Sequence, residues 1–68
     1  MADAVYKKIE LVGTSKESFS AAAAGAIAKA GETVKNMSWF EVTEQRGSIV
    51  DAKVAEYQVT VLIGFRVE

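Results

Sequence analysis

The chain has 68 residues, half of them hydrophobic, with no Cys, His or Pro and a formal net charge of −1 at pH 7. These counts exclude disulfides, a Cys/His zinc site, and catalysis by a Cys–His pair or a Ser–His–Asp triad. They offer no basic stripe for phosphates, so we expect no nucleic-acid partner. A single small domain over residues 1–68 cannot bury so much apolar surface alone, and we expect self-association to cover the remainder.

The first predicted element is a strand over residues 5–12. Its apolar positions alternate loosely with charged ones and share one face, which holds Val5, Ile9 and Leu11. This alternation is typical of a strand with one buried and one partly wet face. Gly13 is expected to end the strand.

An alanine-rich amphipathic helix is predicted to follow. Thr14 and Glu17 match a capping box with Thr14 as the N-cap, and Ser15 is the alternative cap. Apolar residues then recur with a helical period. They are Phe19, Ala23, Ala26, Ile27, Ala30 and Val34.

The apolar stripe predicts that the helix runs through Gly31 to Lys35 or Asn36, although a glycine inside a helix costs about 1 kcal/mol against Ala. The alanine-rich part is shorter than the roughly 20 apolar residues of a membrane span. It also begins too late in the chain for a signal peptide. We therefore expect no membrane partner and a cytoplasmic protein.

Two further strands are predicted over residues 39–48 and 55–67, joined by the polar link Asp51-Ala52-Lys53 into an antiparallel hairpin. The predicted fold class is α+β, with a three-stranded antiparallel sheet wrapped on one helix in the order β-α-β-β. One helix covers one face of such a sheet. The other face and the two edges are left for neighbouring subunits.

Trp39 is the single tryptophan and is expected on the uncovered face, because alternation turns it away from Phe40 and Val42. Two interpretations stay open. The indole either fills a subunit interface, as tryptophan often does, or forms a flat platform for a planar aromatic ligand. One stacking contact supplies about 1–3 kcal/mol, less than the roughly 4 kcal/mol of a millimolar complex. A useful site would need a second aromatic ring, which a neighbouring chain could supply.

Polar residues of the hairpin are further candidates. The Gln58 amide offers a donor and an acceptor that suit a pyrimidine edge, although an exposed strand glutamine is also ordinary. Arg46 and Arg66 are either surface ion-pair partners or charges for a phosphate.

Five segments of the chain resemble the bacterial dodecins. They are YKKIELVGTS at residues 6–15, NMSWFEV at 36–42, RG at 46–47, YQVTV at 57–61 and GFRVE at 64–68. The resemblance covers essentially the whole chain. It implies a hollow homododecamer of cubic symmetry that holds flavins in pairs at its subunit interfaces.

The resemblance also implies roles for individual residues. Trp39 would stack on the isoalloxazine, Gln58 would bind its pyrimidine edge, and Arg46 and Arg66 would lie near the phosphate or ribityl chain. The arginines favour FMN over riboflavin, FAD or lumichrome. Some bacterial dodecins also bind coenzyme A near the threefold axes. The positions that we associate with coenzyme A are Tyr6, Lys7, Lys29, Thr33 and Lys35.

The function implied by the resemblance is storage and protection of flavin, with Trp39 quenching its photochemistry by electron transfer. We expect no enzyme and no metal site, because no nicotinamide fingerprint and no acid–base constellation is present. The main alternative is a structural homo-oligomer without flavin, in which Trp39 is interface packing. A flavin reductase is the weaker alternative.

Overall fold

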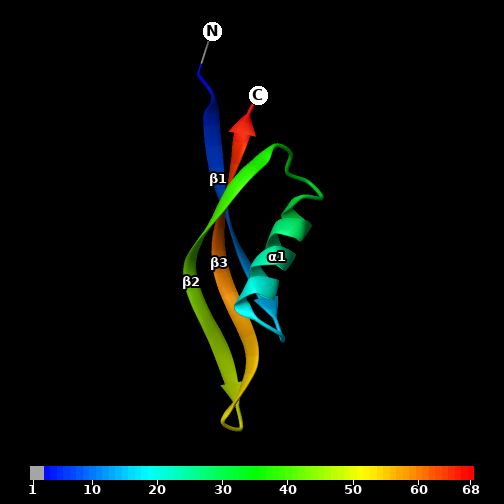
Figure 1. The fold of residues 1–68 in the computed structure, drawn as a ribbon, viewed down its shortest axis with the longest axis vertical. Helices are drawn as coiled ribbons and strands as arrows, with labels where there is room; N and C mark the ends of the chain where they lie inside the picture. The colour runs from blue at the N-terminus through cyan, green and yellow to red at the C-terminus, as the bar shows by residue number, and fades with distance from the viewer. Residues whose placement is uncertain (1–2) are drawn as a thin grey trace.

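A computed structural model describes residues 3–68 and shows one helix and three antiparallel strands. The elements are β1 (Val5–Ser15), α1 (Phe19–Ala30), β2 (Met37–Val50) and β3 (Lys53–Val67). The strand order is β1-β3-β2, so β3 is central and α1 lies along one face of the sheet (Figure 1). The predicted α+β fold with β-α-β-β order is confirmed. No helix within residues 3–68 is long and apolar enough to cross a membrane.

The core is a thin layer between α1 and β3. Four alanines of the helix (Ala22, Ala23, Ala26 and Ala30) pack with Val59, Val61 and Ile63 of the central strand. Their small side chains let the helix approach the sheet closely, and Phe19 and Ile27 flank them half-buried. The predicted apolar stripe is therefore the buried face of α1.

The helix lies over β1 and β3 and leaves β2 largely uncovered. Phe40 and Val42 were expected under the helix. They lie on its side of the sheet but remain 50% and 41% exposed. Together with Ile27 and Phe19 they line a groove of about 340 Å³ between α1 and β2.

Gly13 does not end the first strand, which contradicts the prediction. β1 continues to Ser15, and Gly13 pairs with Val59 within the ladder, two pairs before its end. The glycine is needed because α1 crosses directly above it. A Cβ at this position would collide with the carbonyl oxygen of Ala22.

The predicted N-cap is also wrong. Ser18 caps α1, with an extended backbone and its Oγ accepting a hydrogen bond from the Ala21 N–H at 2.9 Å. Because β1 runs on to Ser15, Thr14 is still in the strand and cannot start a helix. The Ser15 hydroxyl instead accepts the Glu17 N–H at 2.9 Å and shapes the connecting turn.

The helix ends at Ala30, with Gly31 as its C-cap, and does not run to Lys35 or Asn36 as predicted. The Val34 N–H still donates to the Ala30 carbonyl at 2.8 Å, but residues 31–33 form a turn and the helix does not continue. Asn36 then adopts the left-handed conformation (φ 64°) and redirects the chain into β2. Asparagine tolerates this conformation better than most residues.

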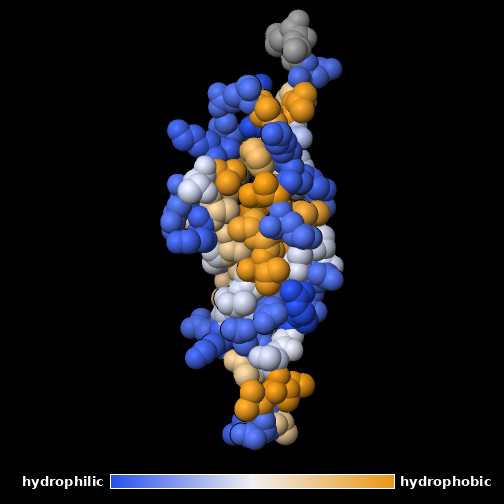
Figure 2. Space-filling view, turned by 180° about the vertical axis from the view of Figure 1, so that it is seen from behind, coloured by the Kyte–Doolittle hydropathy of each residue, from blue (hydrophilic) through white to orange (hydrophobic). Residues whose placement is uncertain are grey.

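The hairpin of β2 and β3 is longer than predicted and projects beyond the helix (Figure 1). Its turn has two residues, Asp51 and Ala52, both with positive φ, while Lys53 already belongs to β3. Positive φ at both central residues is the type I′ geometry that matches strand twist. Beside the turn lie the exposed side chains of Ile49, Val50 and Val54, seen as the orange group at the lower end of Figure 2.

Replacing Ser18 by Ala is expected to lower the free energy of unfolding by about 1 kcal/mol, because the Ala21 N–H loses its acceptor. Urea denaturation at fixed protein concentration measures the effect. Ser20→Ala makes the same change at an exposed position inside α1 and serves as the control. Equal stability of the two variants would refute the cap.

Candidate functional site

Trp39, Arg46 and Gln58 all lie on the face of the sheet that α1 does not cover. Trp39 pairs with Gly64 and Arg46 pairs with Gln58, whereas Val59, Val61 and Ile63, which alternate with this face along β3, point into the core. Strict alternation along β2 would put Trp39 and Arg46 on opposite faces. An irregularity between Val42 and Glu44 shifts the register and returns Arg46 to the face of Trp39.

The indole of Trp39 lies flat over the backbone of Gly64. A Cβ at Gly64 would collide with the six-membered ring of the indole, so only glycine permits this contact. The ring of Tyr6 meets the indole edge-on, with centroids 5.2 Å apart and an interplanar angle of 62°. Although its ring covers Gly64, Trp39 remains 39% exposed, so part of the indole is accessible to a stacking partner.

A carboxylate holds the edge of this indole. Trp39 Nε1–H donates to Glu41 Oε2 at 2.9 Å, and Lys8 Nζ donates to the same oxygen at 3.0 Å. The hydrogen bond from Trp39 and then that from Lys8 lower the pKa of the Glu41 carboxyl below its ordinary value. The carboxylate therefore stays ionised at neutral pH, and the contact is lost only as pH falls through the lowered pKa.

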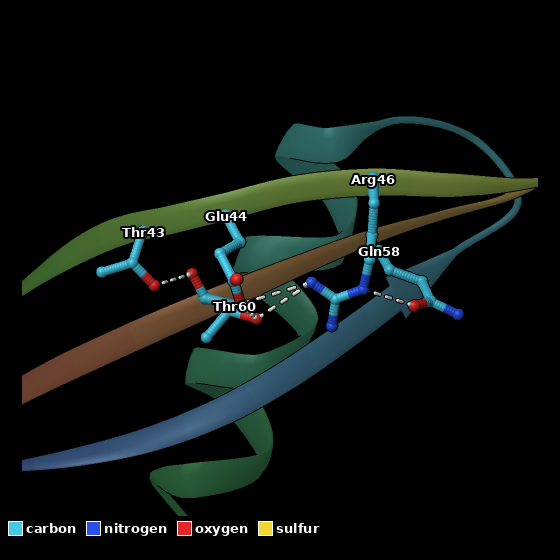
Figure 3. Close-up of polar contacts among 5 residues, drawn as sticks. All are labelled: Thr43, Glu44, Arg46, Gln58 and Thr60. Atoms are coloured by element: carbon cyan, nitrogen blue, oxygen red, sulfur yellow. Dashed lines mark hydrogen bonds and ion pairs between the residues drawn. The ribbon is translucent and has the colours of Figure 1, made fainter.

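Arg46 and Gln58 form a second polar group farther along the hairpin (Figure 3). Arg46 Nε donates to Gln58 Oε1 at 3.1 Å, and Arg46 Nη1 donates to the Thr60 hydroxyl at 3.2 Å. Glu44 accepts from the same hydroxyl at 3.0 Å and lies 3.6 Å from Arg46 Nη1. The Gln58 amide nitrogen donates to Glu56 at 2.9 Å. Both polar ends of Gln58 are thus oriented by charged neighbours.

The structure separates this polar group from Trp39. Gly64, beneath the indole, is six residues from Gln58 along β3. At about 3.3 Å per strand residue, that is roughly 20 Å. Arg66 lies at the Trp39 end, where it pairs with Tyr6 and lines a cavity between the two ends of the chain. The candidate residues of one chain therefore fall into two separate groups, Trp39 with Arg66 and Arg46 with Gln58.

The residues associated with coenzyme A are also spread over different parts of the fold. Tyr6 lies against Trp39, on the uncovered face. Lys7 pairs with Phe65 on the other face, and Lys29 forms an exposed ion pair with Glu32 at 3.3 Å. Thr33 and Lys35 lie in the connection between α1 and β2. Coenzyme A binding stays a prediction, since no described contact joins these side chains.

Sequence reasoning missed two residues that shape the tryptophan site. Glu41 follows Trp39 by two positions and therefore shares its face. Gly64 interrupts a long apolar strand, a pattern that often marks close approach of another group. Within residues 3–68, no three His, Cys, Asp or Glu side chains gather closely enough to hold a metal ion.

Comparisons with known proteins match this chain along nearly its whole length. The family model described as Dodecin matches residues 5–68. The dodecin of Thermus thermophilus is 55% identical over 64 residues, which are 94% of this chain and 93% of that protein. A crystal structure from T. thermophilus aligns with a TM-score of 0.92 at 53% identity and covers 97% of each chain. Dodecin from Streptomyces coelicolor aligns with a TM-score of 0.94 at 41% identity, covering 100% of this chain and 97% of that one.

Proposed function

The chain belongs to the dodecin family, and on this basis we propose that it binds flavins between its own subunits and stores them in a protected form. The observation that carries the proposal is the Trp39 indole, which lies over Gly64 and yet remains 39% exposed. An aromatic platform of this kind fits the planar isoalloxazine ring, and stacking on it contributes about 1–3 kcal/mol.

The separation of these two groups supports binding between subunits. A tricyclic ring lying on Trp39 is too short to reach Gln58 of the same chain across roughly 20 Å of strand. A neighbouring subunit that brings its own hairpin alongside would place Gln58 against the pyrimidine edge. Arg46, held by Gln58, and Arg66, beside Trp39, supply the positive charge that favours FMN over riboflavin.

The exposed apolar surface supports assembly into a homododecamer, the oligomer that the family resemblance implies. Figure 2 shows apolar atoms across the middle of the molecule and at the hairpin tip. Within residues 3–68, ten large hydrophobic residues are exposed, among them Ile49 at 74% and Val5 at 64%. A 68-residue chain that leaves so many apolar side chains in water gains stability when copies cover them.

Protection follows from the chemistry of the platform. Bound flavin absorbs visible light and is photoreactive. The electron-rich indole of Trp39, in contact with it, would return the excited state to the ground state by rapid electron donation and recovery. This role needs no acid–base residue, and we propose a binding protein, not an enzyme.

A structural assembly without flavin is the second candidate, since a half-exposed tryptophan also suits interface packing. Titration of FMN with the purified protein separates the two. We expect flavin fluorescence to be quenched in a saturable way at micromolar protein. Unchanged fluorescence, together with colourless protein after incubation and removal of free FMN, would favour the structural assembly.

A further inference from the structure

The Trp39 ring is held at its edge by a carboxylate that is itself anchored from across the sheet. Glu41 Oε2 accepts one hydrogen bond from Trp39 Nε1–H and another from Lys8 Nζ, at 2.9 and 3.0 Å. Lys8 comes from β1 and pairs with Gly64, the residue under the indole. The ion pair between β1 and β2 thus spans the central strand beside the ring.

The other described contacts of the indole are non-polar. It lies on the backbone of Gly64 and packs against the ring of Tyr6 at an interplanar angle of 62°, and neither contact engages its N–H. A hydrogen bond from Nε1 to a fixed acceptor selects one orientation about the last side-chain torsion, which is otherwise broad. The ion pair itself is weakly stabilising, because both side chains are 43% exposed. Its effect on the ring is therefore separable from folding.

We propose that Glu41 is a positioning residue for the ligand, with Lys8 as its anchor. By fixing the indole before binding, Glu41 reduces the ordering that a stacked ring has to impose, and affinity increases accordingly. The inference rests on the proposed flavin binding and extends it to a residue that does not itself need to touch the ligand. The lowered pKa of the Glu41 carboxyl agrees with a persistent contact at neutral pH.

The chain offers a matched control. Glu10 and Glu41 both pair with Leu62, from opposite sides and on the uncovered face, but among the described residues Glu10 makes no hydrogen bond to the indole. We expect Glu41→Ala to weaken FMN binding about three- to tenfold, because the ligand then has to order the indole on binding. Glu41→Gln keeps an acceptor oxygen and should stay within about twofold of the unmodified protein, as should Glu10→Ala.

The ligand-free protein provides an independent readout. In ¹H–¹⁵N spectra, Glu41→Ala should shift the Trp39 Nε1–H resonance and speed its exchange with water, whereas Glu10→Ala should leave both unchanged. Equal FMN affinity of the two alanine variants, or an unchanged indole resonance in Glu41→Ala, would overturn the positioning role. An unmodified protein that binds no FMN would instead overturn the proposed function, and the indole resonance would then decide alone whether Glu41 orients the ring.

Discussion

Replacing Trp39 by Ala is expected to weaken FMN binding about 5- to 150-fold, the loss of one stacking contact worth about 1–3 kcal/mol. The fold should persist, because the indole is 39% exposed and lies on the sheet surface, outside the core of α1 and β3. Assembly should be largely retained for the same reason. Fluorescence titration measures the affinity, and size-exclusion chromatography checks the assembly.

The Trp39→Phe variant separates the contribution of the aromatic ring from that of the indole N–H. It keeps an aromatic face over Gly64 but removes the Nε1–H donor to Glu41. Its loss of affinity should fall between those of the unmodified protein and the alanine variant. If the Trp39→Ala variant binds FMN with undiminished affinity, FMN does not stack on Trp39, whatever number of FMN molecules the assembly binds.

Replacing Gly13 by Ala is expected to cost about 2–3 kcal/mol of unfolding free energy, near the upper part of the range for overpacked interiors. The added methyl would collide with the Ala22 carbonyl oxygen and lie 2.9 Å from Ala26 Cβ. The carbonyl belongs to the helix backbone, so α1 as a whole must move away from the sheet. Denaturant unfolding at fixed protein concentration measures the change.

Gly25→Ala is the opposite case within the same helix. A Cβ there meets nothing within 4 Å, and alanine favours the helix by roughly 0.5–1 kcal/mol over glycine. We therefore expect the two glycine substitutions to differ in sign. A Gly13→Ala protein as stable as the unmodified one would mean that the close helix–strand approach is wrong.

The β-α-β-β order was predictable because its signals are periodic. Alternation in the strands and the apolar stripe of the helix extend over many residues, and local exceptions do not erase them. The ends of the strands and of the helix were harder to predict from the sequence. In the sequence, Gly13 looks like a residue that ends a strand. In the fold, its missing side chain leaves room for α1 to pack against β1, and the sequence gives no sign of that contact.

The candidate site was predictable in its residue types and not in its arrangement. Trp39 could be assigned to the uncovered face from its alternation with Phe40. Arg46 reaches that face only through the irregularity between Val42 and Glu44, for which the sequence carries no clear signal. The contact of Glu41 with both Trp39 and Lys8 likewise depends on β1 and β2 flanking the same central strand.

We propose that the flavin site exists only between subunits. Two observations support this proposal: the apolar surface that a single short chain leaves exposed, and the separation of Trp39 from Gln58 along the hairpin. Assembly and flavin binding should therefore fail together when the subunits are dissociated.

Native mass spectrometry of the protein with FMN tests this claim most directly. We predict a dodecamer that carries FMN and a residual monomer that carries none, with FMN lost as the assembly is dissociated by dilution or mild denaturant. A monomer that retains FMN with the affinity of the assembly would contradict the account, as would a dodecamer that remains free of FMN at saturating ligand.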